Sequence, residues 1–105
     1  MTIYAPVTID ERKINAGLQR AKKALAPDVV RIRFNVGEDW TGTPALFFRV
    51  VLKDKASTPG KLGELVQRIS NKIDEETKAY GFGLFPYVDF RSLSETHELK
   101  EAEWD

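Results

Sequence analysis

The sequence predicts a single α+β domain in which two helices cover one face of a small, mostly antiparallel sheet, in the order α-β-β-α-β-(α). Two segments carry apolar residues at helical spacing, and three others alternate apolar with polar residues as half-buried strands do. At 105 residues the chain is long enough to bury a core without disulfides. We expect one domain over residues 1–93, followed by an acidic C-terminal tail or short helix over residues 94–105.

The first element is predicted to be a helix that begins after Thr8 and ends before Pro27. Thr8 and Glu11 have the spacing of a capping box, and the residue before a proline disfavours helical backbone. The apolar stripe of this helix is formed by Ile14, Leu18, Ala21 and Leu25. Gly17 lies inside the helix, where glycine costs about 1 kcal/mol relative to alanine. We therefore expect close packing at Gly17.

Residues 29–36 and 45–53 are predicted to form an antiparallel hairpin, because the turn-rich link between them is short. In the first strand, one face is expected to carry Val30, Ile32, Phe34 and Val36, and the other Arg31, Arg33 and Asn35. In the second strand, one face is expected to carry Leu46, Phe48, Val50 and Leu52, and the other Phe47, Arg49, Val51 and Lys53.

A second helix is predicted to start near Pro59 and to stop at Gly81. Its apolar stripe consists of Leu62, Leu65, Val66, Ile69, Ile73 and Tyr80. A third strand over residues 84–91 is expected to start at a sheet edge, because Pro86 cannot donate a ladder hydrogen bond. In this strand Val88 and Phe90 should face inward, and Tyr87, Asp89 and Arg91 outward. Ser92 and Glu95 have the spacing of a second capping box.

Composition excludes several classes of function. Sixteen basic and sixteen acidic side chains give no net charge, which excludes a uniformly basic nucleic-acid binder. The absence of cysteine excludes disulfide scaffolds, thiolate metal sites and thiol catalysis, and a single histidine excludes a multi-histidine metal site within one chain. We therefore expect no cofactor and no metal. Neither a signal-peptide pattern nor a membrane-spanning run is found, so a cytoplasmic location is expected.

The outward face of the predicted sheet is the principal candidate for a binding surface. It would present Arg31, Arg33, Phe47, Arg49, Lys53, Tyr87 and Arg91. Cations interleaved with aromatic rings suit single-stranded nucleic acid, whose phosphates and bases they bind. Arginine and aromatic residues are also enriched at the cores of protein interfaces. Residue types alone do not separate these two readings from a solvated face on which arginine stems cover Phe47.

The loop between the first two strands is the second candidate, through Glu38, Asp39 and Trp40. Two carboxylates beside a tryptophan can bind a cation or a polar ligand, but adjacent carboxylates diverge and make a poor catalytic pair. The structural alternative is that Trp40 folds back over the hairpin end as a lid, while Asp39 or Thr41 caps the turn. Residues 60–63 (Gly-Lys-Leu-Gly) can hold an anion at a helix start, although the start of the helix alone explains them.

Two stretches, GEDWTGTPALFFRVVL at residues 37–52 and PYVDFRS at residues 86–92, resemble small bacterial proteins of unassigned function. This resemblance spans roughly residues 28–95 and implies no activity. The order of elements is also similar to that of type II KH domains and ribosome-binding factor A, which implies RNA binding. Those domains carry G-x-x-G between two helices, whereas residues 60–63 here follow a loop that contains Pro59.

We expect a non-catalytic protein-interaction module, either a homodimer or an accessory subunit of a partner protein. Its contact would use the outward sheet face, an exposed edge strand, or the acidic tail with Trp104. The alternative is an RNA-binding or single-stranded DNA-binding module on the same face, through Arg31, Arg33, Arg49, Lys53 and Arg91. An enzyme would have to rest on Glu38, Asp39, Tyr87 and Asp89, whose spacing singles out no acid–base chemistry.

Overall fold

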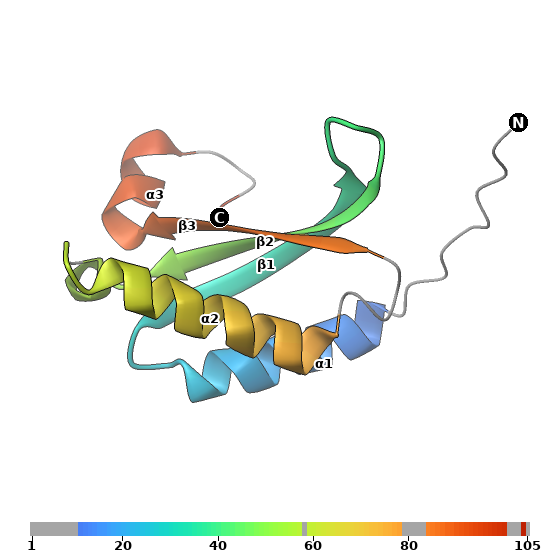
Figure 1. Cartoon of the computed structure of the whole chain (residues 1–105). Coiled ribbons are helices and arrows are strands. Elements are labelled where there is room, and N and C mark those ends of the chain that lie inside the picture. The colour runs from blue at the N-terminus through green and yellow to red at the C-terminus, as the bar shows by residue number, and fades with distance from the viewer. Residues whose placement is uncertain (1–10, 58, 79–83, 101–103, 105) are drawn as a thin grey trace, which may run out of the picture.

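The computed structural model describes residues 11–57, 59–78, 84–100 and 104. Its elements are α1 (Glu11–Ala24), β1 (Val29–Glu38), β2 (Pro44–Leu52), the 3-10 turn η1 (Asp54–Ala56), α2 (Leu62–Thr77), β3 (Phe85–Ser92) and α3 (Leu93–Leu99). Helices α1 and α2 lie side by side under one face of the sheet, and α3 lies over the other face at one end (Figure 1). The predicted α+β class and order of elements are confirmed. Within the described part of the chain, no helix is long and apolar enough to cross a membrane.

The sheet is mixed, with β2 in the centre and β1 and β3 as its edges. β1 and β2 pair antiparallel, as predicted for the hairpin. β3 runs parallel to β2, which requires a crossover, and the chain makes it through η1 and α2 on the inner side. Pro86 lies in an edge strand, as predicted.

The core lies between the two helices and the inner face of the sheet. Its buried members are Ile14, Leu18 and Leu25 from α1 and the turn after it, Val29, Leu46, Phe48, Val50 and Leu52 from the sheet, Leu65, Ile69 and Ile73 from α2, and Ala56 and Leu84. Central strand β2 contributes the most completely buried set, because strands flank it and helices cover it. The edge strands contribute Ile32, Phe34, Val88 and Phe90, which pack against this core but are only partly buried.

Two strand predictions are wrong in detail. A β-bulge between Val29 and Arg31 shifts the register, so that Val29 rather than Val30 faces Leu52 and is buried. Strand β2 ends at Leu52, because the chain turns there into η1. Lys53 is the N-cap residue of η1, one position beyond the end of the strand.

The C-terminal end of α2 also differs from the prediction. The helix ends at Thr77, with Lys78 in the left-handed conformation, and so stops before Gly81. Acidic residues at positions 74–76 oppose the helix dipole at this end, and the last turn has no basic residue to offset them. Thr8, Tyr80 and Gly81, which the sequence placed at helix ends and in the stripe, lie outside the described residues.

Helix α3 is fixed at its start by two sets of hydrogen bonds. Ser92 and Glu95 form the predicted capping box, with both reciprocal hydrogen bonds present. The backbone N–H and the hydroxyl of Ser94 donate to the carboxylate of Asp54 at 3.0 and 2.6 Å. These hydrogen bonds tie α3 to η1, and the Ser94 hydroxyl holds the pKa of Asp54 below its usual range.

Helices α1 and α2 come closest at Gly17. A Cβ atom built on Gly17 would lie only 2.4 Å from the carbonyl oxygen of Glu76. One turn further along α1, Arg20 forms an ion pair with the Glu76 carboxylate at 2.6 Å. The close packing predicted at Gly17 is confirmed.

We expect Gly17→Ala to lower the free energy of unfolding by about 1–3 kcal/mol, the usual cost of overpacking, despite the better helix propensity of alanine. Gly63→Ala is the matched control, because a Cβ there meets no atom within 4 Å. It should raise stability by about 0.5–1 kcal/mol. Urea unfolding of the two variants measures both changes, and a Gly17→Ala variant as stable as Gly63→Ala would contradict the close contact.

Candidate functional site

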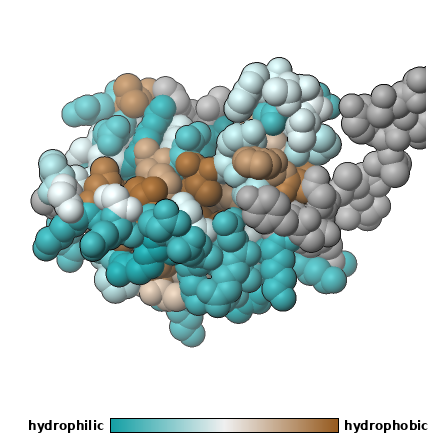
Figure 2. All heavy atoms as spheres, in the orientation of Figure 1, coloured by the Kyte–Doolittle hydropathy of each residue, from teal (hydrophilic) through white to brown (hydrophobic). Residues whose placement is uncertain are grey.

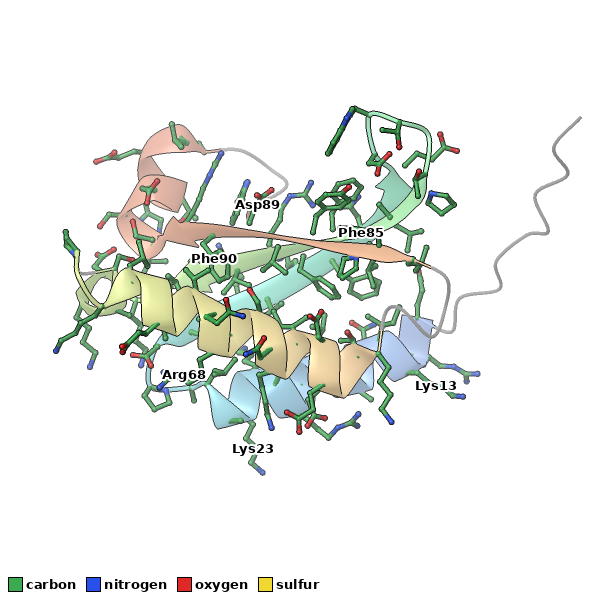
Figure 3. The ribbon with its side chains drawn as sticks, in the orientation of Figure 1. Lys13, Lys23, Arg68, Phe85, Asp89 and Phe90 are labelled. Carbon is green, nitrogen blue, oxygen red and sulfur yellow. The ribbon has the colours of Figure 1, made fainter. Side chains whose placement is uncertain are left out.

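The outer face of the sheet, on the side away from α1 and α2, holds most of the predicted binding residues. The pairing register arranges its side chains in three rows across the strands: Asn35, Phe47 and Tyr87; Arg33, Arg49 and Asp89; Arg31, Val51 and Arg91. In Figure 3, Asp89 is labelled above the β3 ribbon, and Phe90 below it on the side of the helices. Six of the seven predicted binding residues therefore lie in the strands of this face, and Lys53 lies one residue beyond the end of β2.

The row nearest α3 is covered by Trp104 of the same chain. Trp104 is only 5% exposed. The Nε and Nη2 groups of Arg31 donate to the backbone carbonyl oxygen of Trp104 at 3.1 and 2.8 Å, and the guanidinium carbon of Arg91 lies 4.5 Å from the centre of the Trp104 ring. Val51, between the two arginines in this row, is also buried. Arg31 and Arg91 thus hold the chain's own tryptophan, and Trp104 offers little surface to a partner.

The opposite end of the outer face carries four aromatic rings, Trp40, Phe47, Phe85 and Tyr87, which we call the aromatic cluster. The Tyr87 ring is its centre: it stacks on Phe47 at 5.4 Å between centroids and makes tilted contacts with Phe85 at 5.0 Å and Trp40 at 5.9 Å. Trp40 is 85% exposed and Phe85 is 48% exposed. The prediction that Trp40 forms a lid on the core is wrong, since this exposed side chain does not belong to the core and packs on Tyr87 of the outer face instead.

Phe85 was missed as a member of this surface. It lies at the first position of β3 and inside the predicted strand, but only Tyr87, Asp89 and Arg91 were assigned to the outward side of that strand. The available signal was its spacing, because Phe85 and Tyr87 are two residues apart and side chains at that spacing share one face of a strand.

Asp39 builds the turn that carries Trp40. Its Oδ1 accepts hydrogen bonds from the backbone N–H groups of Thr41 at 2.8 Å and Thr43 at 3.0 Å, and from the Thr41 hydroxyl at 2.6 Å. Its Oδ2 accepts a hydrogen bond from the Tyr87 hydroxyl at 2.9 Å. The Thr41 hydroxyl in particular lowers the pKa of Asp39 to about 2. Asp39 therefore caps the turn, as the structural alternative predicted, and it also holds the Tyr87 hydroxyl, which was not predicted.

The central row of the outer face is polar and lies open between these two ends. Arg49 is half-buried and donates a hydrogen bond to the side-chain oxygen of Asn35, while Arg33 and Asp89 are exposed. We call the central row together with the aromatic cluster the open part of the outer face. Its two arginines are balanced by the carboxylates of Asp39 and Asp89, so this surface has no strong charge of one sign.

The carboxylates on which an enzyme would rest are not brought together. Glu38 pairs with Pro44, and Asp89 pairs with Arg49 five residues further along β2. At about 3.3 Å per residue, that separation is roughly 17 Å. The pKa of Asp39 is moved away from neutrality rather than toward it. In the described ranges, no group of three or more His, Cys, Asp or Glu side chains could hold a metal ion.

The helical side of the molecule is mostly hydrophilic in the view of Figure 2, and its hollows are shallow. Two of them, of about 550 and 510 Å³, share Asp28 and Arg68, which form an ion pair at 2.8 Å. Lys61 lines the second hollow, just before α2 begins, and Gly60 has a φ of 92° in the preceding turn. The glycines of residues 60–63 thus serve the turn and the start of α2.

Comparisons of the chain with models of protein families, with curated proteins and with solved structures find no match. The resemblances to small bacterial proteins and to type II KH domains stay predictions.

The two tryptophans provide a direct test of how the outer face is divided. Trp104→Ala should cost about 3 kcal/mol of unfolding free energy, as expected for a buried tryptophan. Trp40→Ala should change stability by less than about 0.5 kcal/mol. The chain has only two tryptophans, so emission from Trp104 in the Trp40→Ala variant should be blue-shifted relative to emission from Trp40 in the Trp104→Ala variant. Equal emission maxima, or equal losses of unfolding free energy in the two variants, would contradict the burial of Trp104.

Asp39→Asn should destabilise the hairpin in a pH-dependent way. The folded-state pKa of Asp39 is about 2, below its ordinary value of 3.8, so its stabilising contribution is complete above that ordinary value and is lost as pH falls toward 2. The difference in melting temperature between wild type and Asp39→Asn should therefore be largest above pH 5 and should shrink between pH 4 and pH 2. Glu38→Gln removes a neighbouring carboxylate without touching these hydrogen bonds and controls for charge. A difference in melting temperature that does not change with pH would show that the Asp39 carboxylate does not stabilise the turn.

Proposed function

We propose that this chain is a non-catalytic protein-interaction module, acting as a homodimer or as an accessory subunit, whose open part of the outer face binds a protein partner. The observation that carries the proposal is the aromatic cluster, because Trp40 and Phe85 are largely exposed on a sheet face that α3 and Trp104 leave uncovered. Tryptophan, tyrosine and arginine are the residues that most often supply binding energy at protein interfaces.

The charges of the same surface favour a protein over a nucleic acid. Two of the predicted phosphate-binding arginines, Arg31 and Arg91, are engaged with Trp104, and Lys53 lies beyond the end of β2. Of the two remaining arginines, Arg33 and Arg49, Arg49 lies opposite Asp89 in the sheet, and the Asp89 carboxylate would repel phosphates. Nucleic-acid affinity depends on several uncompensated cations, whereas interface cores combine aromatic rings with a few balanced charges.

The aromatic cluster is also held in place before any partner arrives. Tyr87 is fixed by its hydrogen bond to Asp39 and by stacking on Phe47, and the Asp39 turn positions Trp40. Side chains that are already ordered lose little entropy on binding, which leaves more of the contact energy for affinity. This rigidity supports a binding role better than a solvated loop.

The proposal is tested by affinity capture from the native cell with wild-type, Trp40→Ala and Leu99→Ala chains, compared by quantitative mass spectrometry. Leu99 is the matched control, because it is 52% exposed but lies on α3, away from the aromatic cluster. A hot-spot residue contributes about 2 kcal/mol or more, so partner affinity should fall about 30-fold with Trp40→Ala and stay unchanged with Leu99→Ala. A partner that binds both variants equally would contradict the proposal.

The nucleic-acid alternative is measured on the same proteins. Anisotropy titrations with single-stranded oligo(U) and oligo(dT) at low and high salt should show no specific binding. Tight, salt-sensitive binding that is lost in an Arg33→Glu, Arg49→Glu double variant would overturn the protein assignment and favour the nucleic-acid module.

A further inference from the structure

Edge strand β1 leaves apolar side chains incompletely covered. On the inner face of central strand β2, Leu46 and Phe48 are 0% and 1% exposed. The neighbouring positions of β1 are less well covered: Phe34 is only partly buried, and Val36 is 39% exposed. In Figure 1, β1 lies at the rear of the sheet, over α1, with β2 on its other side. The missing cover is therefore on the outer edge of β1.

This edge is also well suited to pairing. β1 spans Val29–Glu38, contains no proline, and has its single bulge at one end, between Val29 and Arg31. Within the residues that the structure describes, no strand pairs with its outer edge, so its alternate N–H and C=O groups are available. The other edge strand, β3, is shorter, carries Pro86, which has no N–H, and leads directly into α3.

The sequence of β1 selects one register for pairing with a second copy. A two-fold axis perpendicular to the sheet must lie midway between the two copies of one residue. Only then do residues that are directly opposite each other point to the same face of the sheet. An axis at Arg33 places two arginines directly opposite each other, and an axis at Asn35 places Ile32 opposite a Glu38 carboxylate. An axis at Phe34 places Ile32 opposite Val36 of the second copy on the inner face, and Arg33 opposite its Asn35 on the outer face. Glu38 then falls opposite Val30, at the bulge where regular pairing is already interrupted.

We infer that a second copy of this chain pairs antiparallel with β1 about a two-fold axis at Phe34, so that the two sheets join into one of six strands. This inference rests on the proposed interaction function and deepens it by naming one partner and the surface it uses. The pairing covers Phe34 and Val36, and opposes no like charges. It also joins the two outer faces and leaves the two aromatic clusters at opposite ends, free for other partners.

The test is the mass of the full chain in solution, by size-exclusion chromatography with light scattering. Val36→Lys adds a charge to the inner face of the edge, and Leu62→Lys is the matched control, because Leu62 has a similar exposure of 36% but starts α2. Wild type and Leu62→Lys should be dimers, while Val36→Lys should be a folded monomer by circular dichroism, or dissociate at least tenfold more readily. A monomeric wild type, or a Val36→Lys dimer as stable as wild type, would overturn the inference.

The register is tested by isotope-filtered NMR on a dimer of one labelled and one unlabelled chain. Contacts should join Ile32 of one copy to Val36 of the other. Contacts from Val88 and Phe90, or from Trp40 and Phe85, would instead assign the dimer to β3 or to the outer face and would overturn the β1 inference. The two proposals fail separately, because Val36→Lys should still capture a partner through the aromatic cluster, and Trp40→Ala should still dimerise.

Discussion

The burial of strand β2 under α1 and α2 is the constraint on which the other elements depend. β2 supplies Leu46, Phe48, Val50 and Leu52 to the core, and both helices are placed to cover them. That requirement brings α1 and α2 together at Gly17, where the Glu76 carbonyl leaves no space for a side chain. It also sends the chain from β2 through α2 on the inner side, which makes β3 parallel to β2. Both helices therefore lie on the inner face of the sheet.

The outer face of the sheet is therefore covered only by shorter elements. The two ends of this face differ in how they are covered. At one end, Trp104 is held between Arg31 and Arg91, and α3 is tied to η1 through Ser94 and Asp54. At the other end, the Asp39 turn holds an aromatic cluster that nothing in the described structure covers. A domain of this size gains stability from covering apolar surface, so a rigid exposed cluster is better explained by binding than by folding.

Periodicity was enough to predict the helices, the hairpin, the inward and outward sides of β3, and the close packing at Gly17. These features are local, because each depends on spacing within one segment. The sequence also placed Arg31, Arg33, Phe47, Arg49, Tyr87 and Arg91 on one face. It did not reveal that Arg31 and Arg91 contact Trp104, and Arg31 is 73 positions away from Trp104 in the sequence. The bulge at Val29 and the end of β2 at Leu52 depend on tertiary pairing that no single segment encodes.

The division of the outer face into a closed end and an open end is tested most directly by oxidative footprinting of the chain, purified and in its native complex. In the purified chain Trp40 and Phe85 should react readily and Trp104 slowly, because Trp40 is 85% exposed and Trp104 is 5% exposed. In the native complex Trp40 and Phe85 should become protected, while Trp104 stays unreactive. Equal reactivity of Trp40 in both samples, with protection appearing elsewhere on the molecule, would contradict the assignment of the open part as the binding surface.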